Sequence, residues 1–180
     1  MKIIFLTLCL LFLSACRAAV VYDADGAPVI NGGTYYLTSV SKDLFGGLVL
    51  ATVGSDNCPQ TVVLHPLFFP GWPVIIESPF LIPLIDSSFN ISIRFESSSS
   101  EQKFWNVVPE VPFPIVKVSE THAFPFKIES AEGGFKIVYN NSAIGINLED
   151  NSRPLVVNST DPFVFMLTRV NQISAKMSMV

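Results

Sequence analysis

Short apolar runs separated by turn residues dominate the chain after its first residues. The runs are rich in Val, Ile, Phe and Tyr, and Gly, Pro, Asn and Asp punctuate them, whereas no long stretch shows a helical period. This pattern predicts β-strands joined by turns. The expected strands are residues 33–37, 47–51, 61–64, 73–77, 90–95, 104–108, 115–118, 125–129, 134–139, 144–148, 154–157 and 162–167.

The expected strands divide into three successive groups of four. The fourth strand of each group opens with proline and an apolar run, and Ile76-Glu77-Ser78 matches Ile128-Glu129-Ser130 residue for residue. Repeats of roughly 40–55 residues indicate units that cannot bury their own faces alone. A six-stranded barrel closed by three hairpins removes exposed sheet edges. The expected fold class is therefore all-β, a β-trefoil of twelve strands in three four-strand repeats.

The first residues read as a secretory signal. Lys2 precedes an apolar run over residues 3–13, which is too short to span a bilayer in comfort, and small residues follow. We expect cleavage after about Ala18, a single domain over residues 19–180, and a secreted or vacuolar protein without a membrane span. An alternative is a bacterial lipoprotein site, in which Cys16 would be lipidated.

Composition narrows the function classes. The chain is 49% hydrophobic and 14% charged, so it can bury a sizeable core and is not disordered. A net charge of −4 gives no reason to expect a nucleic-acid partner. We expect a monomer.

Cysteine usage predicts a domain held by its core alone. Cys9 and Cys16 fall in the signal, which leaves Cys58 in the mature chain, free of any internal disulfide. Cys58 is either buried and inert or paired with another chain.

Catalytic and metal-binding motifs are missing from the sequence. There is no Gly-x-Ser-x-Gly elbow, no zinc-type spacing of Cys and His, and no phosphate loop, and His65 and His122 read as structural or solvated. We expect no enzyme, no metal and no cofactor. Three sequons are candidate glycosylation sites in a secreted chain: Asn90, Asn140 and Asn158.

One stiff apolar segment lies between two expected strands. It consists of Ser78, Pro79, Phe80, Leu81, Ile82, Pro83 and Leu84. The two prolines fix φ and lack N–H groups, so the segment cannot pair inside a sheet. An apolar loop braced by prolines either packs over the core or forms an exposed surface that binds a partner.

The mature sequence begins with two distinctive segments, Val-Tyr-Asp-Ala-Asp-Gly-Ala-Pro-Val and Asn-Gly-Gly-Thr-Tyr-Tyr-Leu. Together with later segments they make up residues 21–29, 31–37, 58–63, 105–108, 126–129, 135–139 and 154–157. In these segments, in order along the chain, the sequence resembles the plant Kunitz-type (soybean trypsin inhibitor-like) protease inhibitors. The resemblance implies a β-trefoil, a defence-related role and tight inhibition of proteases, usually serine proteases.

The resemblance also implies a site. The reactive loop of the family joins the fourth and fifth strands and begins Ser-Pro-aromatic, as residues 78–84 do. By position Leu81 enters the protease pocket, the scissile bond is Leu81–Ile82, and Asn31 supports the loop from behind. Because leucine carries no charge, we expect chymotrypsin- or elastase-like targets rather than trypsin. The alternatives are a non-inhibitory binding protein on the same scaffold and a cysteine-protease inhibitor that acts through another loop.

Two departures from the family bear on activity. Family members typically carry two disulfides, whereas Cys58 lacks its partner in the Ser97-Ser98-Ser99-Ser100 run and Asn140 stands where another cysteine would. Each lost bridge removes typically about 2–4 kcal/mol of stabilisation. Pro83 cannot donate the N–H that an inhibitor loop normally offers the protease at this position, which costs on the order of 1–3 kcal/mol of binding.

Overall fold

A computed structural model describes most of the mature chain. It covers residues 19–41, 43–44, 46–58, 60–66, 69–97, 102–158 and 160–170. The expected signal over residues 1–18, most of the serine run, and residues 171–180 of the expected domain lie outside the described residues. In the part that is described, none of the helices has the length and apolar character to cross a membrane.

The described residues form twelve strands, as the apolar runs predict. The strands are β1 Gly33–Ser39, β2 Leu48–Ala51, β3 Thr61–Leu64, β4 Val74–Glu77, β5 Ser92–Phe95, β6 Phe104–Val108, β7 Ile115–Ser119, β8 Phe126–Ala131, β9 Gly134–Tyr139, β10 Ser142–Ile146, β11 Leu155–Val157 and β12 Val164–Arg169. The all-β prediction is confirmed.

Six strands close into a barrel. β1 pairs with β4 on one side and β12 on the other, β4 pairs with β5, and β9 joins β8 to β12, all antiparallel. A bridge between Ile91 and Phe126 closes the ring from β5 to β8. Closure leaves the barrel without an exposed edge for another chain to pair with.

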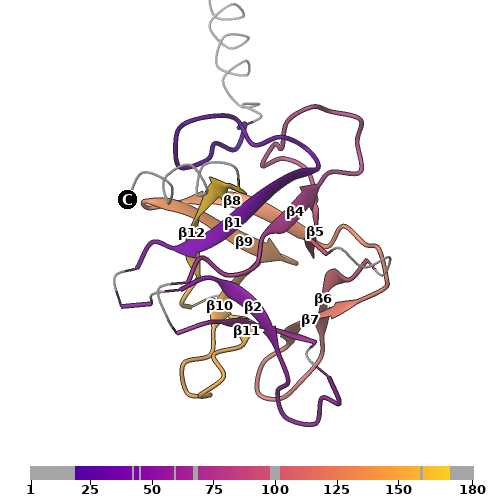
Figure 1. Ribbon diagram of the computed structural model, residues 1–180, viewed down its shortest axis with the longest axis vertical. Helices are drawn as coiled ribbons and strands as arrows, with labels where there is room; N and C mark the ends of the chain where they lie inside the picture. Colours follow the sequence, from indigo (N-terminus) through magenta and orange to yellow (C-terminus); the bar gives the residue numbers. More distant parts are fainter. Residues whose placement is uncertain are drawn as a thin grey trace, which may run out of the picture.

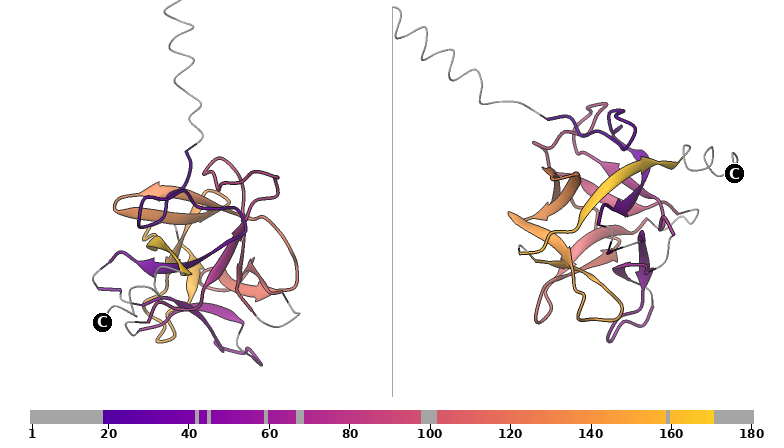
Figure 2. Two further views of the ribbon diagram at one scale, coloured as in Figure 1. Left: turned by 45° about the horizontal axis from the view of Figure 1, so that its top comes forward. Right: turned by 90° about the vertical axis from the view of Figure 1, so that its left-hand side faces the viewer.

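Three hairpins cap one end of the barrel. They are β2–β3, β6–β7 and β10–β11, and β7 pairs with both β3 and β11 (Figure 1). The β2–β3, β6–β7 and β10–β11 loops project from this end, whereas the β4–β5 loop lies at the opposite end (Figures 1 and 2). The expected β-trefoil is confirmed by this arrangement of three four-strand units.

The core is built from the inward positions of every unit. Trp105, Tyr35 and Phe126 are among its largest fully buried side chains. Burying each such side chain stabilises the fold by roughly 1.5–3 kcal/mol. A closed barrel filled in this way is a physical basis for stability without the disulfides of the family.

Strand boundaries differ from the expected ones where prolines and one tight turn intervene. β4, β8, β11 and β12 begin after the prolines that the sequence pattern included, because proline has no N–H for the ladder. β10 begins at Ser142 rather than at residue 144. Asn140 and Asn141 both adopt positive φ, 47° and 63°, so a two-residue turn lets Ser142 pair at once with Tyr139.

Candidate functional site: the β4–β5 loop

The β4–β5 loop presents Leu81 to solvent. Leu81 has a relative exposure of 108%, the highest of the large hydrophobic side chains described, and Phe80 beside it is half-exposed. Pro79 and Pro83 are exposed on either side, while Ser78, Ile82 and Leu84 are half-buried. An apolar residue held fully in water at a loop tip is available to a partner rather than to the core.

Asn31 braces the loop from behind, where the resemblance placed it. Its Oδ1 accepts a hydrogen bond from the Ser78 N–H at 2.8 Å. Its Nδ2 donates to the carbonyls of Phe80 at 3.1 Å and Ile82 at 2.9 Å. One amide side chain therefore ties three points of the loop around Leu81.

The position of Asn31 is itself set by its neighbours. The buried Tyr35 hydroxyl accepts the Ile30 N–H at 2.9 Å, and the Gly32 N–H donates to the Ile76 carbonyl at 2.8 Å. Gly32 has φ of 76°, a conformation that glycine adopts without strain. Asn31 is thus held from β1 and β4 at once.

The carboxyl-side limb of the loop is tied to the amino-terminal segment. The Asn31 N–H donates to the Pro83 carbonyl at 3.0 Å, and Ile30 and Leu84 form a bridge. Ile85 is fully buried, where its N–H donates to Val29 and its carbonyl accepts from Val21. Ile85 therefore anchors this limb in the core.

Phe89 is a loop residue that the sequence alone did not single out. Its ring lies 4.8 Å from the Phe80 ring, centroid to centroid, with the planes tilted by 55°. The contact joins the beginning and the end of the loop, and it fixes the side chain that precedes Leu81. Nothing in the local sequence shows that two phenylalanines nine positions apart would meet, because the return of the chain brings them together.

Cys58 is exposed in the β2–β3 loop. Of the two alternatives expected for it, the one in which the side chain is buried is therefore wrong. The Gln60 amide lies 2.9 Å from its sulfur. The described loop residues 52–58 and 60 lie at the solvent-facing end of the hairpin, and they include the turn residues Gly54, Asp56 and Asn57. No group of three or more Asp, Glu, His or Cys side chains able to hold a metal ion occurs among the described residues.

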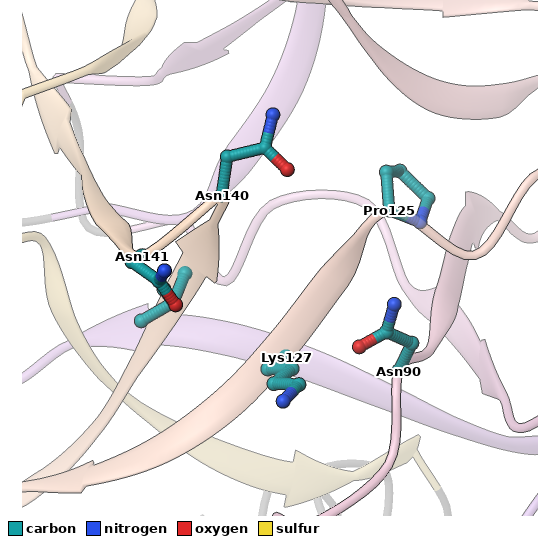
Figure 3. Close-up of a pocket in the computed structure, with 6 residues that line it drawn as sticks. Asn90, Pro125, Lys127, Asn140 and Asn141 are labelled. Carbon is teal, nitrogen blue, oxygen red and sulfur yellow. The ribbon is translucent and has the colours of Figure 1, made fainter.

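Two of the three sequons line one pocket. Asn90, at the end of the β4–β5 loop, lies across a cavity of about 200 Å³ from Asn140 and Asn141 of the β9–β10 turn, with Lys127 between them (Figure 3). Asn158 lies elsewhere, and its Oδ1 accepts hydrogen bonds from the N–H and hydroxyl of Thr160.

Comparisons with known proteins agree with this geometry. The sequence profile of the legume Kunitz family, described as trypsin and protease inhibitor, matches residues 21–169. A Kunitz-type serine protease inhibitor of Bauhinia bauhinioides is 38% identical over 161 residues, which cover 84% of this chain and 98% of that protein. A trypsin inhibitor of Leucaena leucocephala is 32% identical, with 85% of this chain and 97% of that protein covered.

Solved structures show the same fold. A mutant of the Bauhinia bauhinioides kallikrein inhibitor, complexed with human kallikrein 4, aligns with a TM-score of 0.79 at 37% identity, covering 87% of this chain and 99% of that one. Soybean trypsin inhibitor in complex with porcine pancreatic trypsin aligns with a TM-score of 0.74 at 32% identity, covering 84% and 99%. With the β-trefoil and the braced β4–β5 loop, these matches show that the chain belongs to the plant Kunitz-type family of protease inhibitors.

Proposed function

We propose that the protein inhibits serine endopeptidases whose specificity pocket is apolar, of the chymotrypsin or elastase type, by inserting Leu81. The observation that carries this proposal is a fully exposed leucine whose two neighbouring carbonyls, those of Phe80 and Ile82, are both bonded to Asn31. A neutral aliphatic side chain fits an apolar pocket and offers no charge to a trypsin-like one.

The hydrogen bonds orient the bond that would be attacked. Alternate groups of an extended chain face opposite sides. Since the Phe80 and Ile82 carbonyls face inward to Asn31, the Leu81 carbonyl between them faces out, towards the oxyanion hole of a bound protease. The attacked bond is Leu81–Ile82.

Rigidity turns this substrate-like loop into an inhibitor. A loop already held in its bound form loses little conformational entropy on association, so affinity rises without additional buried area. If the bond is cut, Asn31 still holds the carbonyls of Phe80 and Ile82, one on each side, and the ends stay close enough to rejoin. Pro83 works against affinity because it withholds one N–H from the protease.

Titration of the purified mature protein against chymotrypsin, elastase, trypsin and papain tests the proposal. We expect tight inhibition of chymotrypsin or elastase, and its loss in Leu81→Asp, because a carboxylate in an apolar pocket is desolvated without a partner. Leu81→Arg is the matched variant, which should transfer inhibition to trypsin. Full inhibition of chymotrypsin and elastase by Leu81→Asp would contradict the assignment of Leu81. Inhibition of none of the four enzymes would favour a non-inhibitory binding protein.

We further propose that the protein is secreted or vacuolar and carries N-linked glycans at one or more of Asn90, Asn140 and Asn158. The apolar leader and the exposed positions of Asn90 and Asn140 support this proposal. A glycan on Asn90 would lie at the end of the β4–β5 loop and hinder a protease. Amino-terminal sequencing and glycopeptide mass spectrometry of the protein from a plant secretory host test both statements.

A further inference from the structure

The residue that braces the β4–β5 loop is part of an Asn-Gly pair. Asn31 is followed by Gly32, and no other asparagine of the sequence precedes a glycine. In such a pair the backbone nitrogen of the glycine can attack the side-chain amide carbon of the asparagine, because no Cβ hinders its approach. Asn31 is therefore the asparagine of this chain with the least steric protection against deamidation.

Deamidation at this pair releases ammonia and consumes water. The Gly32 nitrogen gives up its proton and forms a bond to the Asn31 Cγ, while the Cγ–Nδ2 bond breaks and Nδ2 leaves with that proton as ammonia. Water then opens the resulting cyclic imide at either of its carbonyl carbons. Opening at Cγ gives aspartate, and opening at the backbone carbonyl gives isoaspartate, so both products carry a carboxylate in place of the amide.

Either product removes the hydrogen bonds that Asn31 donates to the loop. The Asn31 Nδ2 donates to the carbonyls of Phe80 at 3.1 Å and Ile82 at 2.9 Å, whereas a carboxylate has no proton to donate. Isoaspartate also lengthens the backbone by a carbon atom and shifts the segment that carries the brace. Because the two carbonyls lie on either side of Leu81, the modification releases the bond that the loop presents to a protease.

The folded protein holds both reacting groups away from this reaction. The Gly32 N–H donates to the Ile76 carbonyl at 2.8 Å, so the attacking nitrogen is engaged. The Asn31 side chain is held at Oδ1 by the Ser78 N–H and at Nδ2 by two loop carbonyls. These hydrogen bonds must break before Cγ can turn towards the Gly32 nitrogen. The rate of deamidation is therefore set by how often the loop opens locally.

We propose that Asn31 is a deamidation site at which the inhibitor is irreversibly inactivated, and that the braced loop itself delays this reaction. The hydrogen bonds that make the loop a rigid ligand are the bonds that protect the amide. Opening of the loop exposes the amide, and loss of the amide makes the loss of the brace permanent. The inhibitory lifetime of the protein is then set at Asn31. The inactivation, though not the chemistry, rests on the inhibition through Leu81 proposed above.

Mass spectrometry of the aged protein tests the chemistry. The purified mature protein is kept at mildly alkaline pH, where the glycine nitrogen loses its proton more readily, either folded or unfolded in guanidinium chloride. We expect the peptide that contains Asn31 to convert about tenfold or more faster in the unfolded protein, where the protecting hydrogen bonds are absent. Equal rates in the folded and unfolded protein, or no conversion in the unfolded protein, would overturn the proposal.

Gly32→Ala is the matched control for the unfolded arm. Its methyl group hinders attack by the backbone nitrogen, so Asn31 should convert more slowly than in the unfolded wild type. The unfolded arm does not require the variant to fold, although a Cβ at Gly32 would meet no atom within 4 Å in the native structure. Conversion of Asn31 at the wild-type rate in this variant would contradict attack by the Gly32 nitrogen.

Ion exchange supplies the second readout, because each conversion adds a negative charge. Folded protein that has partly converted is separated into fractions with and without the modified Asn31 peptide, and both are titrated against chymotrypsin. We expect the unmodified fraction to inhibit as fresh protein does, and the modified fraction to inhibit about a hundredfold more weakly. Undiminished inhibition by the modified fraction would overturn the proposal. If fresh protein does not inhibit chymotrypsin, the Leu81 assignment fails, while the rates from mass spectrometry still test the deamidation of Asn31.

Discussion

The β4–β5 loop and the β6–β7 loop, residues 108–114, which we call the distal loop, are both exposed and apolar, but different interactions brace them. Both hold an apolar side chain in water, Leu81 in the first and Val111 in the second, on a backbone stiffened by proline. The first is braced by hydrogen bonds from Asn31 to the backbone on both sides of Leu81. The second is braced at its base by ion pairs of Lys117, and prolines restrict its backbone.

The difference bears on what the β4–β5 loop offers a protease. The hydrogen bonds that Asn31 donates to the carbonyls of Phe80 and Ile82 fix the orientation of the peptide bond at Leu81. A protease therefore meets the bond that it would attack in a defined geometry. The ion pairs of Lys117 act at the base of the distal loop rather than on the backbone at its tip. The brace of the β4–β5 loop thus suits substrate-like binding.

Replacing Asn31 by Asp should separate the two loops most sharply. The carboxylate can still accept the Ser78 N–H, but it faces the Phe80 and Ile82 carbonyls without a proton to donate. Losing two hydrogen bonds and placing a charge against two carbonyls should weaken chymotrypsin inhibition by about a hundredfold or more. Inhibition constants measure this, and an unchanged chymotrypsin constant would refute the bracing role.

Replacing Lys117 by Met should act on the distal end alone. Asp56 is nearly buried and would lose its cation, keeping hydrogen bonds from Thr61 and Val53. Because one partner of a largely buried pair is removed, we expect a loss of about 2–3 kcal/mol in the free energy of unfolding. Urea denaturation measures it. Chymotrypsin inhibition below the unfolding transition should equal that of wild type, and a large change there would mean that the two ends are coupled.

Replacing Pro83 by Ala should tighten the Leu81 site. Alanine restores a backbone N–H that can donate a hydrogen bond to a carbonyl of the protease. At the same time the unfolded chain gains some conformational freedom. The net expectation is up to about tenfold tighter inhibition of chymotrypsin. If affinity instead falls, rigidity at Pro83 outweighs the missing donor, and the loop depends on proline as the distal loop does.

Replacing Phe89 by Ala should weaken the same site more modestly. An aromatic pair contributes about 0.5–1.5 kcal/mol beyond its buried area, so a few-fold to tenfold rise in the inhibition constant is expected. Phe89→Tyr retains the ring and should behave as wild type. A faster rate of cleavage at Leu81–Ile82 in Phe89→Ala would show that the contact positions the loop.

Lowering the pH should weaken the Lys117–Asp56 pair at the base of the distal loop. The hydrogen bonds of Asn31 involve no titrating group, so they should persist. Burial raises the pKa of Asp56, but hydrogen bonds from Lys117 and Thr61 outweigh it and hold the pKa below its ordinary value of 3.8. The hydrogen bond that Lys117 donates to Asp56 raises the pKa of Lys117. A lowered carboxyl pKa contributes stability above the unfolded value, and this is lost as pH falls through the folded value. The difference in melting temperature between wild type and Asp56→Asn should therefore shrink below about pH 3.8, and a constant difference would contradict it.

Much of the fold followed from local sequence pattern. Apolar runs and turn residues determine which segments are strands, and the repeat of four strands indicates the threefold barrel. Several boundaries moved by one or two residues, for example where a proline lacks an N–H, as before β4, or where Asn140 and Asn141 make a two-residue turn.

The candidate site also combines features that are local in the sequence with contacts that only the fold creates. The prolines and apolar tip of residues 78–84 are local features, and they identify a stiff loop. The contacts of Asn31 and the Phe80–Phe89 pair join segments far apart in sequence or folded back on themselves, so no local pattern contains them.

By itself, the sequence determined the strand set, the stiffness of residues 78–84 and the absence of charge at Leu81, because these depend on single residues and their neighbours. Only the tertiary structure decided that Leu81 and Val111 face water, which atoms Asn31 and Lys117 contact, and that the two loops lie at opposite ends. The physical reason is that exposure and long-range hydrogen bonds are properties of a closed barrel, and they exist only once distant strands have paired.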